Sequence, residues 1–221
     1  MQPQHPYAAY APAPQQLYRQ NFFVPPGAST APLLGSGLRK AKLAIGIAQV
    51  VCALAFLGLL ATGLAIGPEG DAGTVFLAVS GGFMGLWYLL MLAYGVIGMV
   101  WTYKFWSWIP PEQRHTSMWK KYISPGQALG FMFIPYFNLY WMFVIYLGIA
   151  DVLERMRVAY PTDKGPAKNL ALLRLIVPFV FFPAGPFLDY FFDKHVEGMA
   201  ADMQARMLAP APVAAHGSVL V

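Results

Sequence analysis

Three ionisable side chains near the C-terminus have the types and spacing of a metal-assisted site. Asp189 and Asp193 lie four residues apart, so they share one face of a helix, and His195 follows them. Paired carboxylates of this kind can hold divalent cations, and enzymes that act on lipid head groups use acidic helical motifs beside the membrane. Such sites need further carboxylates or histidines at set spacings, and the sequence places none nearby. We therefore expect solvated charges on a helix face, with no catalytic, cofactor-binding or metal-binding residue.

A second set of residues points to transport. Pro135 and Asn138 lie in the middle of the uncharged stretch 124–150, and Arg174 lies inside a later apolar block. Proline breaks the helical hydrogen-bond ladder, and an amide is costly to leave unpaired in hydrocarbon. Broken helices and intramembrane charge mark ion or solute paths. Arg174 lies near the start of its block, so we expect its side chain to reach the membrane interface.

The composition is that of a membrane protein. Of the 221 residues, 57% are hydrophobic and only 11% are charged, against about 25% in a soluble domain. The net charge of +5 comes from short basic clusters beside apolar blocks, which favours a cytoplasmic membrane face over nucleic-acid binding. The single Cys52 excludes an intrachain disulfide.

The apolar blocks predict an all-α integral membrane fold with about four transmembrane helices, because one crossing needs about 20 apolar residues. The third helix should be kinked at Pro135. The expected spans are about 43–66, 78–101, 126–150 and 169–188. They belong to a membrane helical domain over 39–192, which follows a disordered Pro/Tyr-rich tail (1–38) and precedes a polar C-terminal helix and short tail (193–221).

Local signals refine the connections. Ser124, Pro125 and Gln127 have the spacing of an N-cap, a first-turn proline and a capping box. The stretch 112–122 could form a short amphipathic helix on the membrane surface, with Met118 and Trp119 facing inward. An aromatic cluster at the end of the second block is interpreted as a headgroup-level belt, with a ligand-stacking patch as the alternative. Its members are Trp101, Tyr103, Trp106 and Trp108.

The positive-inside rule gives a cytoplasmic N-terminus but leads to a conflict. Basic residues flank the first block and follow the second, while the connector between these blocks has none. If the third segment crosses fully, the stretch 151–168 lies outside, although it carries four Lys and Arg residues. Four full crossings are the topology we predict. The alternative is that segments three and four dip in and return, near 135–138 and 183–186, which requires backbone buried in protein.

The stretch S-P-G-Q-A-L-G-F-M-F-I-P-Y-F-N-L-Y-W resembles a motif of uncharacterised bacterial multi-pass membrane proteins with a domain of unknown function. Their pattern is S-P-G-x-A-x-G, then apolar residues, P-x-x-N and an aromatic residue. The matching positions are Ser124, Pro125, Gly126, Ala128, Gly130, Pro135, Asn138, Tyr140 and Trp141. The resemblance implies a multi-pass protein of the bacterial inner membrane, and it implies no activity.

Two functional hypotheses remain. The first is a non-enzymatic scaffold or regulatory subunit that contacts membrane lipid and binds another protein through its tails. This hypothesis is compatible with a homo-oligomer. The alternative is a small channel or transporter that uses the broken third helix. The residues expected to carry a structural or functional role are Ser124, Pro125, Gly126, Pro135, Asn138, Trp141 and Arg174.

Overall fold

A computed structural model describes residues 35–67 and 70–208, and within these ranges the chain is all-helical, with six α-helices and no strand. The predicted all-α class is therefore confirmed. Most of the predicted tail 1–38, and the whole of 209–221, lie outside the described residues. The helices are α2 (Gly35–Ile66), α3 (Asp71–Trp108), α4 (Pro125–Gly130), α5 (Phe137–Ala159), α6 (Lys168–Val180) and α7 (Gly185–Leu208).

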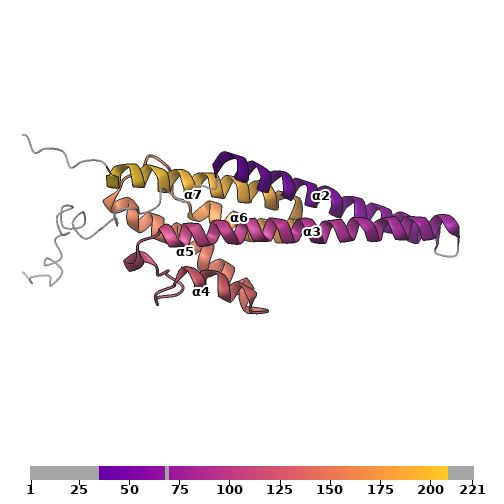
Figure 1. The fold of residues 1–221 in the computed structure, drawn as a ribbon, viewed down its shortest axis with the longest axis horizontal. Coiled ribbons are helices and arrows are strands. Elements are labelled where there is room, and N and C mark those ends of the chain that lie inside the picture. Colours follow the sequence, from indigo (N-terminus) through magenta and orange to yellow (C-terminus); the bar gives the residue numbers. More distant parts are fainter. Residues whose placement is uncertain (1–34, 68–69, 209–221) are drawn as a thin grey trace, which may run out of the picture.

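Helices α2 and α3 form a long antiparallel hairpin whose far end projects beyond the other helices (Figure 1). They measure about 48 and 57 Å at 1.5 Å per residue, which exceeds the roughly 30 Å hydrocarbon layer of a bilayer. The two helices pack closely near the tip, where a Cβ added at Gly63 would lie 3.2 Å from Phe76 Cβ. Large apolar side chains such as Leu64, Val75 and Leu89 are exposed along the hairpin, as expected of a surface that faces lipid.

Among the helices of 35–67 and 70–208, three are long and apolar enough to cross a membrane: α2, α3 and α5. This supports the prediction of a multi-pass membrane protein. The predicted spans 43–66 and 78–101 lie within α2 and α3. The prediction of four spans is not confirmed, because the third and fourth predicted segments are both interrupted.

The third segment, 126–150, folds back on itself. Helix α4 ends at Gly130, a 3-10 turn covers Phe131–Phe133, and α5 begins at Phe137. The indole of Trp141 donates a hydrogen bond of 2.9 Å to the carbonyl of Ala128, 13 residues earlier, whereas a continuous helix would separate them by about 20 Å. A single kinked helix is therefore not what the chain forms. Proline at 135 cannot continue the hydrogen-bond ladder, and the left-handed Tyr136 (φ 61°) accompanies the reversal.

The fourth segment, 169–188, is interrupted in the same way. Helix α6 ends at Val180, a 3-10 turn covers Phe182–Ala184, and α7 begins at Gly185. Arg174 Nε lies 2.5 Å from Asp189 Oδ1, although a continuous helix would place these residues about 22 Å apart. Helices α6 and α7 are thus an antiparallel pair, and the predicted single span is two helices.

The connector before α4 also differs from the prediction. Only the 3-10 turn Pro111–Gln113 is helical there, so the amphipathic helix expected over 112–122 is wrong. Hydrogen bonds from Arg114 to the carbonyls of Ser107 and Ile109 hold the chain in an irregular path instead. Met118 is exposed, whereas Trp119 packs edge-on against Trp141.

The expected aromatic belt is mostly core. Trp101 and Trp106 are fully buried, and Trp106 donates a hydrogen bond of 2.8 Å from its indole to the carbonyl of Ile123. Of the four aromatic residues predicted to form the belt, only Tyr103 has an exposed side chain. The core lies where α5, α6 and α7 pack along one half of the α2–α3 hairpin (Figure 1).

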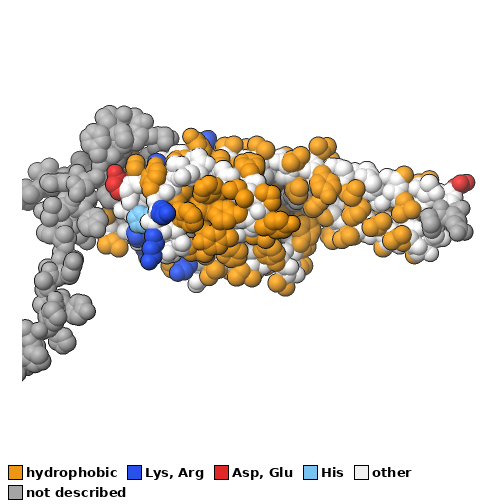
Figure 2. Space-filling view, turned by 90° about the horizontal axis from the view of Figure 1, so that it is seen from below, with side chains coloured by type: hydrophobic (Ala, Val, Ile, Leu, Met, Phe, Trp, Pro, Cys, Tyr) orange, Lys and Arg blue, Asp and Glu red, His pale blue; other side chains and the backbone are white. Residues whose placement is uncertain are grey.

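Charged side chains gather at the end of the molecule opposite the hairpin tip. On the face in Figure 2, Lys and Arg side chains cluster at that end, hydrophobic side chains cover the middle, and an acidic side chain marks the tip. Contacts also join the chain before the third segment to the chain after it, because Arg155 Nη2 donates to the carbonyls of Gln113 (3.1 Å) and His115 (2.6 Å). We call this end of the molecule the basic side.

Candidate functional site

Six charged side chains meet between α2, α6 and α7, and we call them the charge cluster. Three are basic and three are acidic, so the formal charges balance. They are Arg39 and Lys42 of α2, Arg174 of α6, and Asp189, Asp193 and Glu197 of α7.

Helix α7 supplies all three acids from one face, because their spacing is four residues each time. The carboxylate of Asp193 is fully buried and lies 2.6 Å from Lys42 Nζ and 3.3 Å from Arg174 Nη1. The carboxylate of Asp189 lies 2.5 Å from Arg174 Nε and 3.5 Å from Lys42 Nζ. Each of these two acids therefore touches both bases, which ties three helices together.

Glu197 forms the outer part of the charge cluster. It pairs with Arg39 of α2 and accepts a hydrogen bond of 2.9 Å from the indole of Trp101 in α3. A buried charge is costly unless it is paired and hydrogen-bonded, and Glu197 meets both conditions. Trp101 thereby links α3 to the same network.

Aromatic rings enclose the arginine. The guanidinium of Arg174 lies 3.8 Å from the ring centre of Tyr146 in α5, and the rings of Phe192 and Trp101 lie at 4.9 and 5.8 Å. Desolvated cation–π contacts contribute about 2 kcal/mol each. The hydroxyl of Tyr94 in α3 donates to Asp189 Oδ2 at 2.6 Å, so all five long helices contact the network.

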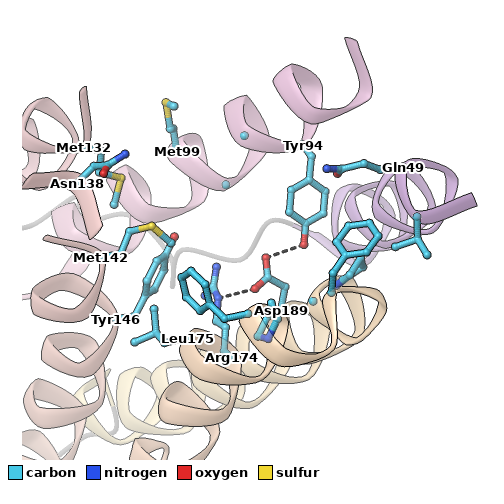
Figure 3. Close-up of a pocket in the computed structure, with 18 residues that line it drawn as sticks. Gln49, Tyr94, Met99, Met132, Asn138, Met142, Tyr146, Arg174, Leu175 and Asp189 are labelled. Carbon is cyan, nitrogen blue, oxygen red and sulfur yellow. Dashed lines mark hydrogen bonds and ion pairs between the residues drawn. The ribbon is translucent and has the colours of Figure 1, made fainter. Parts of the chain in front are cut away.

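A cavity of about 450 Å³ adjoins the charge cluster, within the range of small-molecule sites (Figure 3). Tyr94, Arg174 and Asp189 form one wall of it, and the amides of Gln49 and Asn138 lie on opposite sides. The other lining is mainly apolar and includes Val50, Gly95, Gly98, Met99, Met132, Met142, Leu175, Pro178, Phe179 and Phe182.

The first residues of the S-P-G-x-A-x-G motif form the N-terminal cap of α4. Ser124 accepts a hydrogen bond of 3.1 Å from the Gln127 amide, and the Gln127 side chain accepts one of 2.9 Å from the Ser124 amide. Pro125 occupies the first turn, so the predicted capping box is confirmed. Gly126 lies in the same turn, and none of these residues lines the cavity.

The later residues of the motif divide between packing and the cavity. Pro135 lies at the exposed reversal, and Trp141 is buried between α4 and α5. Asn138 lines the cavity together with Arg174, a juxtaposition that the sequence did not reveal.

Two predictions about charge are wrong. Arg174 does not extend to the membrane interface, because its side chain is 6% exposed and held by two acids. Asp189 and Asp193 are not solvated, since both are paired with bases across the helix interface. The missed signal is Glu197, which continues their four-residue spacing and extends an acidic stripe toward the bases of α2.

The pairing limits the chemistry available here. Within 35–67 and 70–208, no group of three His, Cys, Asp or Glu side chains could hold a metal ion. His195 lies apart from the charge cluster, with Nε2 2.8 Å from the carbonyl oxygen of Gly165. Because each acid of the cluster already contacts a base, a proton acceptor or cation ligand would have to break an ion pair first.

A smaller acid–base group ties the other end of α7 to the α5–α6 connector. Asp202 accepts hydrogen bonds from Thr162 Oγ1 (2.9 Å) and Lys164 Nζ (3.0 Å). The hydrogen bonds from Lys164 and Thr162 hold the pKa of Asp202 below its usual value. This pair is well exposed, unlike the charge cluster.

No family model, curated protein or solved structure matches this chain. Function is therefore inferred from the charge cluster and the cavity themselves.

Proposed function

We propose that this protein is a non-enzymatic scaffold or regulatory subunit of the bacterial inner membrane. In this proposal the α2–α3 hairpin anchors the chain, and the charge cluster fixes α5, α6 and α7 against it as a platform on the basic side. The observation that carries the proposal is the 3:3 balance of charges in the cluster, of which Lys42, Arg174, Asp193 and Glu197 are buried and Arg39 and Asp189 are partly exposed. A set of acids and bases that satisfy one another favours a fixed packing geometry over turnover.

The membrane topology that we propose has two crossings and two returning hairpins. Helices α2 and α3 cross, while α4–α5 and α6–α7 enter from the basic side and return to it. Antiparallel contacts support this, since Gln113 meets Arg155 and Lys164 meets Asp202. The topology places 104–124 and 151–168 on one side, so the conflict with the positive-inside rule disappears and the N-terminus is cytoplasmic.

The tips of the returning hairpins also support this topology. Tyr136, Phe179 and Val180 are 92%, 72% and 85% exposed at the two turns. Such side chains are expected to lie in the apolar layer, because exposing several of them to water at two neighbouring tips is unfavourable.

Partner capture tests the scaffold proposal. Crosslinking and pull-down from native membranes should recover a defined protein with the full chain, and a variant without residues 1–34 should lose it. A variant without residues 209–221 is the matched control and should retain the partner. Equal recovery by all three chains would contradict binding through the N-terminal tail.

A second candidate function, a small channel or transporter, rests on one specific observation. Asn138 faces a cavity whose wall contains Arg174 and Asp189, and polar groups of this kind line solute paths. Proton and potassium flux into vesicles containing the purified chain tests it, with Asn138→Leu as the variant. Flux that Asn138→Leu abolishes would favour transport over the scaffold, and the absence of flux would remove this candidate.

A further inference from the structure

Four polar groups of the cavity make no hydrogen bond to another described residue. Two are the side-chain amides of Gln49 and Asn138, the third is the hydroxyl of Tyr146, and the fourth is Nη2 of Arg174, whose ion pairs use Nε and Nη1. Polar groups in apolar surroundings are costly without partners, and binding sites combine apolar walls with a few such groups. The cavity therefore offers donors and acceptors to a guest.

The charge beside the cavity selects against an ionic guest. Arg174 and Asp189 both line the wall, and each is already neutralised within the charge cluster. A bound anion would lie beside the carboxylate of Asp189, and a bound cation would lie beside Arg174. Either would also need to lose its hydration shell, so the site fits a guest whose polar part is uncharged.

The position of the cavity identifies the source of the guest. Gln49 lies about 10 Å along α2 from Lys42, in the direction of the hairpin tip. The lining includes Phe179 and Phe182 at the turn between α6 and α7, and both side chains are exposed at the surface. An opening lined by exposed rings on a membrane protein meets acyl chains, so the guest reaches the cavity from the lipid layer.

We propose that this cavity binds one membrane lipid with an uncharged polar head, of which a diacylglycerol is the simplest example. The head bonds to the amides of Gln49 and Asn138 and to the hydroxyl of Tyr146. The chains leave past Phe179 into the bilayer. Such a site is compatible with either function proposed above and goes beyond both.

Binding of dioleoylglycerol to the full chain in detergent micelles, measured as a 1:1 adduct by native mass spectrometry, tests the proposal. Gly98→Leu fills the cavity from α3, where a Cβ meets no atom within 4 Å. Gly85→Leu is the matched control, since it places the same side chain on the same helix, also in open space but outside the cavity lining. We expect Gly85→Leu to bind like the wild type and Gly98→Leu to bind roughly tenfold or more weakly.

Three further arms test the head group and the location. The double variant Gln49→Leu/Asn138→Leu should bind dioleoylglycerol more weakly than the wild type while binding hexadecane equally well. Dioleoylphosphatidylglycerol, which is anionic, should compete poorly. A dioleoylglycerol analogue with a chain diazirine should label peptides that contain Phe179 or Phe182, and this measurement does not depend on how any variant folds.

The outcomes are distinct. Unchanged binding by Gly98→Leu, or labelling confined to the hairpin tip, would overturn the location. Preferential binding of the anionic lipid, or of the alkane over dioleoylglycerol in the wild type, would overturn the uncharged polar head. Absence of a wild-type adduct together with absence of labelling would overturn the site as a whole.

Discussion

Asp193 is the member of the charge cluster whose removal should cost most. Its carboxylate is fully buried and lies 2.6 Å from Lys42 Nζ and 3.3 Å from Arg174 Nη1. The change Asp193→Asn keeps the size of the side chain and leaves the cluster with a net charge of +1. Arg174 retains its contact with Asp189 at 2.5 Å, whereas Lys42 retains only a contact at 3.5 Å. The penalty therefore falls mainly on Lys42.

The size of the penalty follows from this geometry. Removing one partner of a buried ion pair costs about 3–5 kcal/mol, and the remaining contact to Asp189 places the expected loss near 3 kcal/mol. The double variant Lys42→Met/Asp193→Leu restores the balance of charges. Its loss should be smaller than the sum of the losses from Lys42→Met and Asp193→Leu by about 1–3 kcal/mol, the coupling energy of groups in contact.

Reversible unfolding in mixed micelles measures these free energies of unfolding. Asp202→Asn is the matched control, because its partner Lys164 lies 3.0 Å away and both side chains are more than one third exposed. An exposed pair contributes about 0–1 kcal/mol. If Asp193→Asn costs no more than Asp202→Asn, or if the double variant loses the full sum, the cluster does not tie α7 to α2 and α6.

Three other predictions follow from local contacts. Because hydrogen bonds lower the pKa of Asp202, this carboxylate should stabilise the fold above its unfolded-state pKa of about 3.9, and the contribution should disappear as pH falls below its folded-state pKa. The free energies of unfolding of wild type and Asp202→Asn should therefore differ by under about 1 kcal/mol at pH 7, and the difference should shrink as the pH is lowered step by step from 7 to 2. A difference that stays constant over this whole range would refute the assignment. Ser124→Ala removes the N-cap of α4 and should cost about 1 kcal/mol in unfolding free energy, while Ser124→Asp should retain most of the stability; equal losses would exclude capping. Trp141→Phe leaves a buried carbonyl of α4 without its donor and should cost about 1–3 kcal/mol in addition to lost packing, with faster hydrogen exchange in 125–133; unchanged exchange there would show that the indole does not hold the reversal.

The parts of the fold that depend on residues close together in the chain could be predicted from the sequence. An uncharged apolar run is sufficient to identify α2 and α3, because a bilayer requires helices of that length. The capping box at Ser124 was predictable because its residues are three positions apart and bond to one another.

The reversals could not be predicted from apolar content alone. Hydropathy reports how apolar a segment is but not the direction in which its second half runs. Proline at 135 predicts a kink, yet the chain turns back, and the indole of Trp141 bonds to a carbonyl of α4 across the reversal. The conflict in basic charge over 151–168 was the one sign that the segments return.

The charge cluster could not be predicted from the sequence for a different reason. An acidic face of a helix looks the same in sequence whether it meets water or bases on another helix. Lys42 and Asp193 are separated by 151 positions, so only the packing of α7 against α2 reveals the pair. The same holds for the cavity, whose polar groups come from α2, α3, α5, α6 and α7.

The central claim is that the segments between 124 and 188 return to the basic side, where the charge cluster fixes them to the spanning hairpin. Cysteine accessibility in oriented membrane vesicles tests it most directly, with Lys164→Cys as the probe in a Cys52→Ala background. Lys120→Cys reports the basic side, and Asp71→Cys reports the hairpin tip. The proposed topology predicts that Lys164→Cys reacts with a membrane-impermeant maleimide from the same side as Lys120→Cys. Reaction from the side of Asp71→Cys would mean that the third segment crosses fully and would contradict it.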